Sequence, residues 1–250
     1  MPTDLNDLLD LMSSQGVHLP QTYVSAVTEV CFSGSFAANS EAQHRLHGRM
    51  FQDPRVLGYR FLRHSAHETI GARIIADVAA QVPSDAHDGI REKMESHASD
   101  EFRHGRMFKT AAERLFEFPS DEISKIQKET SDHKQDFDKK FQGNIKNFIC
   151  STHLGEIRSY FLLESYISIA KNLSDQKFHQ VKAMLEVIYG DEVRHLIYTG
   201  NYLTEWMKND STLCEFFKKM LSVYSDESNH EKRILMSYNQ NYANNVSAII

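Results

Sequence analysis

Hydrophobic and polar residues alternate with a helical period along four long segments of the chain. Apolar positions recur every three or four residues, which is the spacing of one face of an α-helix. The segments span residues 53–82, 85–119, 143–172 and 174–208. The pattern therefore predicts an all-α protein built on four long helices.

Local signals indicate where three of these helices begin. Asp53 is suited to the N-cap position, and Pro54 to the first helical position that follows it. Ser84 and Asp85 are expected to cap the second helix, and Ser174 the fourth. Because the first two helices and the last two are joined by short turns, each pair is expected to run antiparallel.

The remaining segments are expected to form shorter helices and one long connection. Residues 4–50 are predicted to hold two or three helices, one of them opened by Pro20. Residues 119–143 are polar, with a short helix expected from Ser120, and are long enough to cross a bundle. Two short helices are predicted within 211–241.

We expect one domain over residues 1–250, since the chain is within the size range of a single large domain. Its metal-binding core would be 53–208, flanked by accessory helices in 1–52 and 209–250. Residues after Tyr242 are expected to be loosely held.

Ionisable residues interrupt the apolar face of each long helix near its middle. The pentapeptide pattern D-E-x-R-H occurs at 100–104 and again at 191–195. Within each copy, Glu and His are three residues apart and so share a helix face. Each copy follows a helix with a central Glu, which makes a weak internal repeat. The candidate residues are Glu68, Glu101, His104, Glu156, Glu192 and His195.

Distances from the turns favour Glu156 over Glu164 as the residue contributed by the third helix. Glu156 lies 17 residues before the turn at Leu173–Asp175, and Glu192 lies 17 residues after it. Glu164 lies only nine residues before that turn, which displaces it by about 12 Å along the helix. The alternative remains open from the sequence.

Four ionised carboxylates in an apolar core would each cost several kcal/mol if they were unpaired. Two divalent cations would cancel their charge, and two neutral imidazoles would complete the ligand set. Mixed oxygen and nitrogen ligands without thiolates suit iron or manganese. One buried Glu-x-x-His pair alone would more often be a hydrogen-bonded core pair, but the repetition on four faces favours a dinuclear metal site.

Composition excludes several other classes of protein. The net charge of −6 disfavours a nucleic-acid-binding protein, which usually has a basic face. Cys31, Cys150 and Cys214 form no C-x-x-C pattern, so neither a rubredoxin-type iron centre nor a zinc finger is expected. No signal peptide and no membrane span of ~18 apolar residues is recognised. We expect a soluble cytoplasmic protein with reduced thiols.

The repeated motif resembles that of the ferritin-like diiron carboxylate superfamily. D-E-x-R-H is similar to the form seen in bacterial multicomponent monooxygenases, and residues 101–105 also look like the first motif of soluble acyl-carrier desaturases. The resemblance covers residues 53–208. It implies a ferritin-like four-helix bundle with a long crossover. It also implies that the six candidate residues ligate two iron ions and that Asp100 and Asp191 orient the ligand imidazoles.

Several other histidines occur close to these motifs. His97 precedes Glu101 by one turn, and a similar extra histidine ligand occurs in the diiron arylamine N-oxygenases, on their later motif helix. His97 is either a seventh ligand or a core histidine. His64, His67 and His153 are expected to serve packing or hydrogen bonding, and His44 and His47 are expected at the surface.

The expected function is that of a non-haem diiron oxidoreductase, a monooxygenase or oxidase that uses O2 as co-substrate on a small organic molecule. The reaction would be N-oxygenation, hydroxylation or desaturation. The site would hold two Fe ions, or a Mn/Fe pair. Electrons would come from a separate reductase or ferredoxin, and a homodimer is possible. The alternatives are a ferroxidase or peroxide-scavenging protein of the ferritin and rubrerythrin kind, and a non-catalytic helical interaction protein stabilised by metal.

Overall fold

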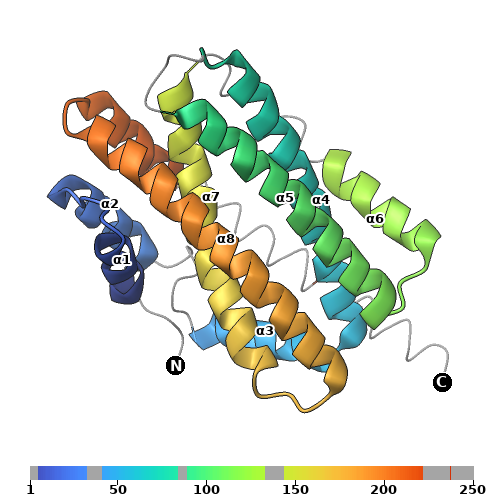
Figure 1. Ribbon diagram of the computed structural model, residues 1–250. Coiled ribbons are helices and arrows are strands. Elements are labelled where there is room, and N and C mark those ends of the chain that lie inside the picture. The colour runs from blue at the N-terminus through green and yellow to red at the C-terminus, as the bar shows by residue number, and fades with distance from the viewer. Residues whose placement is uncertain (1–4, 33–40, 84–88, 133–143, 222–236, 238–250) are drawn as a thin grey trace.

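Four long helices lie side by side and form the body of the molecule (Figure 1). The computed structural model describes residues 5–32, 41–83, 89–132, 144–221 and 237, and their regular structure is entirely helical. The long helices are α4 (Pro54–Gln81), α5 (Ile90–Leu115), α7 (Ile145–Ala170) and α8 (Gln176–Met207). The shorter ones are α1 (Leu5–Ser14), α2 (Gln21–Phe32), α3 (Glu41–Gln52) and α6 (Ser120–Asp132). The prediction of an all-α protein is confirmed.

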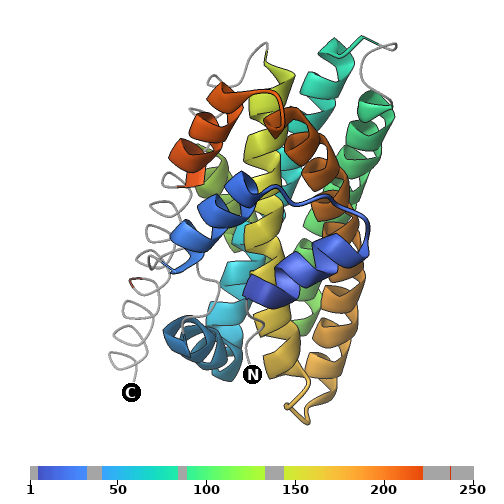
Figure 2. The same ribbon diagram turned by 90° about the vertical axis from the view of Figure 1, so that its left-hand side faces the viewer.

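The long helices pack in pairs. The α4 helix packs along α5, α7 packs along α8, and the two pairs meet where α5 contacts α8. The α6 helix, which begins the predicted long connection, lies on α4. On the opposite side α1 and α2 lie across α7 and α8 (Figure 2). Among the described helices, none is long and apolar enough to cross a membrane.

The observed helix starts agree with the predictions only in part. The Asp53 carboxylate caps α4 by accepting the backbone N–H groups of Arg55 and Val56, as expected. The cap of α8 is Asp175 rather than Ser174, because the Asp175 carboxylate accepts the N–H of Lys177.

The predicted start of the second long helix is wrong. The α5 helix begins only at Ile90, after Gly89 in the left-handed region at φ 78°, a conformation that glycine adopts without strain. Residues 84–88, which hold the expected caps, lie outside the described residues. The second short helix expected within 211–241 also lies largely outside them, whereas residues 211–221 are helical.

Two apolar clusters fill the bundle, one toward each end of the long helices. One cluster contains Met94, Leu154, Leu196 and Leu203, and the other contains Phe61, Phe108, Leu163, Tyr166 and Leu185. Along α5 and α8, buried ionisable residues occupy the positions between the two clusters. A layer of charge therefore separates two ordinary hydrophobic cores.

Two smaller expectations concern side chains outside this layer. His47 is buried rather than at the surface, with Nδ1 2.8 Å from the Ser165 hydroxyl of α7, and the half-buried His44 contacts the same hydroxyl at 3.0 Å. Cys150 and Cys214 are free thiols, and burial raises the pKa of Cys150. The side chain of Cys31 lies outside the described residues.

Candidate metal centre

The two D-E-x-R-H motifs face each other at the contact between α5 and α8. Glu101 and His104 come from α5, and Glu192 and His195 come from α8. All four side chains are at most 4% exposed. Each pair shares a face because Glu and His are three residues apart on a helix. The motifs therefore bring two carboxylates and two imidazoles together inside the bundle.

Two groups of side chains could each hold a metal ion. The first group is His97, Glu101, Glu156 and His195, and the second is Glu101, His104 and Glu192. Within each group, one ligand atom from every residue lies within 4.8 Å of the others. Because Glu101 belongs to both groups, the two candidate positions are adjacent and share a carboxylate.

Glu68 approaches the second group from α4. Its side chain is half-buried overall, but its carboxyl group lies beside those of Glu101 and Glu192. Burial, followed by the negative charges of these two neighbours, raises the pKa of Glu68 well above its usual value. Five of the six residues expected to bind metal thus belong to the two groups, whereas Glu68 belongs to neither and lies beside the second.

Glu156 and Glu164 have different neighbours on α7. Glu156 is 6% exposed, and its Oε1 lies 3.4 Å from Nε2 of His97. Glu164, about two turns further along the helix, interacts with Tyr189 instead. Glu164 belongs to neither group among the described residues. The structure thus places Glu156 in the site, which is the residue that the distances from the turn favoured.

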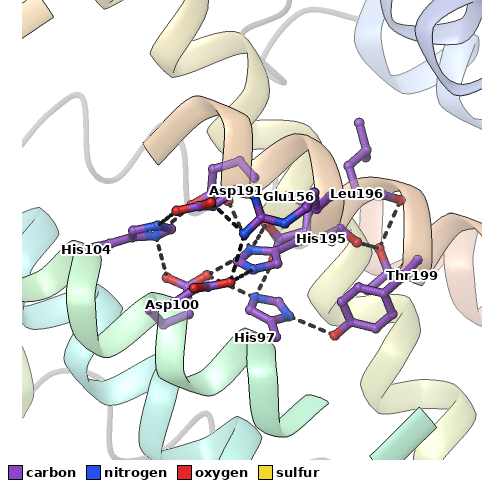
Figure 3. Close-up of polar contacts among 12 residues, drawn as sticks. His97, Asp100, His104, Glu156, Asp191, His195, Leu196 and Thr199 are labelled. Carbon is purple, nitrogen blue, oxygen red and sulfur yellow. Dashed lines mark hydrogen bonds and ion pairs between the residues drawn. The ribbon is translucent and has the colours of Figure 1, made fainter. Parts of the chain in front are cut away.

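Each motif aspartate contacts the histidine of the opposite motif. Nε2 of His104 lies 3.0 Å from Oδ2 of Asp191, and Nε2 of His195 lies 3.3 Å from Oδ2 of Asp100 (Figure 3). The hydrogen bond with His195 is the main cause that lowers the pKa of Asp100 to about 2. The Nδ1 atoms are left to face the glutamates. This arrangement is typical of histidines that bind metals.

Arginines from the same motifs connect the two aspartates. Arg194 contacts Asp191 at 2.6 Å and Asp100 at 3.2 Å. Arg103 likewise bridges Asp100, at 2.8 Å, and Asp191. Both guanidinium groups are partly exposed, so the network runs from the buried imidazoles to the surface. Two positive charges thereby balance the two aspartates outside the glutamate cluster.

Several buried polar atoms in the site have no hydrogen-bond partner. Nδ1 of His104 is 3.2 Å from Oε1 of Glu192 and 3.5 Å from Oε2 of Glu101, without hydrogen-bonding geometry. Unpartnered buried polar groups are rare because each loses its hydration without compensation. The unpartnered atoms of the two groups are Glu101 Oε2, Glu156 Oε2, His104 Nδ1 and His195 Nδ1. Oxygen and nitrogen atoms in this arrangement fit a pair of metal ions.

The charges of the metal-free site also fit this interpretation. Burial, then the negative charges of Glu101 and Glu156, raise the pKa of Glu192 well above its usual value. Burial alone would lower the pKa of His104, but the carboxylates of Glu101 and Glu192 outweigh it and raise that pKa to about 11. The metal-free cluster therefore retains protons, which bound cations would replace.

His97 lies inside the cluster and not in the neighbouring apolar core. Its Nε2 is 2.9 Å from Oε1 of Glu101, and its ring stacks on that of His195 with centroids 3.7 Å apart. Its Nδ1 is 2.7 Å from the hydroxyl of Tyr198. His97 thus belongs to the first group by position. Sequence reasoning missed Tyr198, although its spacing of three residues from His195 places it on the same helix face.

The other histidines near the motifs have different partners. His153 is fully buried and contacts the hydroxyls of Tyr23 and Thr199 at 2.7 and 2.9 Å. His64 stacks on Phe108 with ring centroids 5.1 Å apart. These contacts agree with the expected packing and hydrogen-bonding roles.

Comparison with known proteins identifies no relative of this chain. No family model, no curated protein and no solved structure matches it.

Proposed function

We propose that the protein is an O2-dependent non-haem diiron oxidoreductase with a ferritin-like bundle, acting on a small organic substrate. The observation that carries the proposal is the set of unpartnered ligand atoms on Glu101, Glu156, His104 and His195. They lie between two aspartates that hold the outer nitrogens of the imidazoles. These atoms contact one another only as ion pairs of 3.2–4.0 Å without hydrogen-bonding geometry, and a pair of cations would bind them directly.

The residues divide into two ligand sets that share carboxylates. Glu68 and His104 would hold one ion, and Glu156 and His195 the other, with Glu101 and Glu192 between them. His97 would either bind the second ion through Nε2 or donate its Nε2–H to the carboxylates of Glu101 and Glu156. This ligand set has four carboxylates and two or three imidazoles without thiolate, which suits iron or a manganese–iron pair. When bound, such a pair supplies redox chemistry with O2.

The protein residues have three roles in this proposal. Asp100 and Asp191 hold the imidazoles so that Nδ1 faces the ions. The two apolar clusters keep bulk water from the buried carboxylates. Burial and neighbouring carboxylates raise the pKa values of Glu68 and Glu192, and bound cations would favour the ionised form of both.

We infer the substrate class and the electron donor from the chemistry that a diiron site would supply. The reaction would be N-oxygenation, hydroxylation or desaturation of a small molecule. Since the sequence has no flavin or nicotinamide fingerprint, electrons would come from an external reductase or ferredoxin. We propose no nucleic-acid or membrane partner.

The test is anaerobic loading with iron(II), metal analysis, and rapid mixing with O2 while absorption is followed. We expect about two iron ions per chain and a transient visible absorption in the wild-type protein. Glu101→Gln removes the shared carboxylate charge and should abolish both. Glu164→Gln is the control, because it makes the same change at a glutamate of α7 that belongs to neither candidate metal group. It should behave as wild type.

Other outcomes would contradict the proposal in distinct ways. Slow oxidation with growing mineral iron would indicate a ferroxidase or storage protein. Bound iron that is inert towards O2 would indicate a metal that only stabilises a helical interaction protein. Absence of bound metal would overturn the metal centre itself.

A further inference from the structure

Three aromatic side chains on α8 form a row that begins beside the candidate metal centre. Tyr198, Tyr202 and Trp206 are spaced four residues apart, so they lie along one face of the helix. Ring centroids are 6.5 Å apart between Tyr198 and Tyr202, and 5.5 Å apart between Tyr202 and Trp206. Trp206 is the only tryptophan of the chain and lies one residue before the end of α8.

His97 connects the inner end of this row to the centre. One ring nitrogen, Nδ1, is 2.7 Å from the hydroxyl of Tyr198, and the other, Nε2, is 2.9 Å from Oε1 of Glu101. Glu101 is the carboxylate shared by both candidate metal positions. A single imidazole therefore joins the Tyr198 phenol to a candidate ligand.

The outer end of the row reaches the surface. Tyr202 and Trp206 are half-buried, and the ammonium group of the exposed Lys93 lies 5.0 Å from the centre of the Tyr202 ring. His97, by contrast, is 1% exposed. The row thus runs from the buried layer of charge to solvent.

We propose that Tyr198, Tyr202 and Trp206 carry single electrons from the surface to the candidate metal centre. Tyrosine and tryptophan are the aromatic side chains that lose one electron most readily, whereas leucine or phenylalanine would serve packing alone. The proposal rests on the proposed function, because the oxidised metal pair is the final electron acceptor. The donor is an external one-electron reductant of the iron–sulfur or flavin class.

Each transfer balances in electrons and protons. One electron would pass from Tyr198 to the oxidised metal pair, and the phenolic proton would pass to Nδ1 of His97. In this role His97 is a neutral hydrogen-bonding residue and not a ligand, because its Nε2–H donates to Oε1 of Glu101. Tyr202 then reduces the Tyr198 radical, which takes its proton back from His97, while Tyr202 releases its own proton to solvent. Trp206 reduces Tyr202, which regains a proton from solvent, and the external donor restores Trp206. The net change is one electron moved from donor to metal pair.

Electron transfer along the row can be tested without iron or O2. A negative result would therefore be distinct from failure of the proposed function. A photoexcited ruthenium polypyridyl complex with a sacrificial acceptor would oxidise the metal-free protein from solution. Transient absorption follows the tryptophanyl and tyrosyl radicals, and electron paramagnetic resonance of frozen samples identifies the final radical. The variants are Tyr198→Phe, Tyr202→Phe and, as a control, Tyr189→Phe, which changes a tyrosine of α8 outside the row.

In wild type we expect the Trp206 radical to decay as a tyrosyl radical forms. Tyr202→Phe should slow that decay several-fold, and Tyr198→Phe should move the final radical to Tyr202 with a changed hyperfine pattern. Tyr189→Phe should match wild type. Equal decay of the Trp206 radical in all four proteins, or no tyrosyl radical in wild type, would overturn the proposal.

Discussion

At the scale of single residues, the contact between aspartate and histidine across the two motifs decides which imidazole nitrogen is available. Asp191 holds His104 at 3.0 Å and Asp100 holds His195 at 3.3 Å, each through Nε2. The carboxylates favour the tautomer that leaves Nδ1 free to bind a cation. Loss of such a partner leaves the ligand in place, but the orientation of its imidazole ring is no longer fixed.

Asp191→Asn and Asp100→Asn should each weaken metal binding by about 10–100-fold. The amide retains the size of the side chain but loses the charge that fixes the imidazole. Calorimetric titration with manganese(II) measures the dissociation constant. Asp77→Asn, on the exposed face of α4, is the control and should bind as wild type. Unchanged affinity in both motif variants would contradict the orienting role.

His153 is a buried histidine outside the candidate centre. It lies between Tyr23 and Thr199, and burial lowers its pKa to about 3. An unfolded chain would titrate this residue near pH 6.5. Between these two values the unfolded state binds a proton that the native state does not.

The free energy of unfolding should therefore fall as the pH drops from about 6.5 towards 3, by up to ~1.4 kcal/mol per pH unit from this residue. Urea unfolding at pH 7 and pH 5 measures the effect. His153→Gln cannot titrate and should lose less stability between the two values. His179→Gln, at an exposed site on α8, should lose as much as wild type. An equal loss in His153→Gln would refute the assignment.

At the scale of helices, Gly105 determines how closely α5 approaches α4. A Cβ atom at this position would lie 2.6 Å from Oγ1 of Thr69 and 3.1 Å from the carbonyl oxygen of Ser65. The backbone oxygen cannot move without moving α4. Since Glu68 lies between these two α4 residues and reaches the centre, the glycine contributes to the site as well as to the packing.

Gly105→Ala should destabilise the protein by about 1–3 kcal/mol, because the added methyl group overpacks the interface. It should also weaken metal binding by displacing Glu68. Gly48→Ala in α3 meets no atom within 4 Å and should stabilise by about 0.5–1 kcal/mol through helix propensity. Urea unfolding of both variants and metal titration of the first are the measurements. A stabilised Gly105→Ala protein would contradict this account.

At the scale of the whole molecule, a layer of charge is enclosed between two apolar clusters. The glutamates of this layer repel one another, and the metal-free protein limits the repulsion by retaining protons. Bound divalent cations would replace those protons and attract all four helices. Metal binding should therefore stabilise the fold as a whole.

Manganese(II) at 100 times its dissociation constant should stabilise the protein by about 2.7 kcal/mol, an effect that a chelator reverses. Thermal unfolding with and without metal measures the shift. In Glu101→Gln the shift should nearly vanish, whereas Glu164→Gln should retain it. A wild-type protein whose melting does not respond to metal would contradict the prediction.

Local sequence was sufficient to predict features that depend on neighbouring residues. Helix period, the Asp53 cap and the shared face of Glu and His in each motif all arise from interactions within a turn or two of one helix. The distances from a short turn also predicted that Glu156 rather than Glu164 would approach the motifs. These features needed no knowledge of the partner helices beyond their antiparallel pairing.

Only the tertiary structure decided which side chains meet across helices. The contact of Asp191 with His104, the link from His97 to Tyr198 and the burial of His47 against α7 join residues far apart in the chain. Such contacts depend on the rotation and approach of packed helices, which a periodic pattern does not specify. The sequence by itself therefore determined the helices and the candidate ligands, and packing determined how those ligands are oriented and connected to the surface.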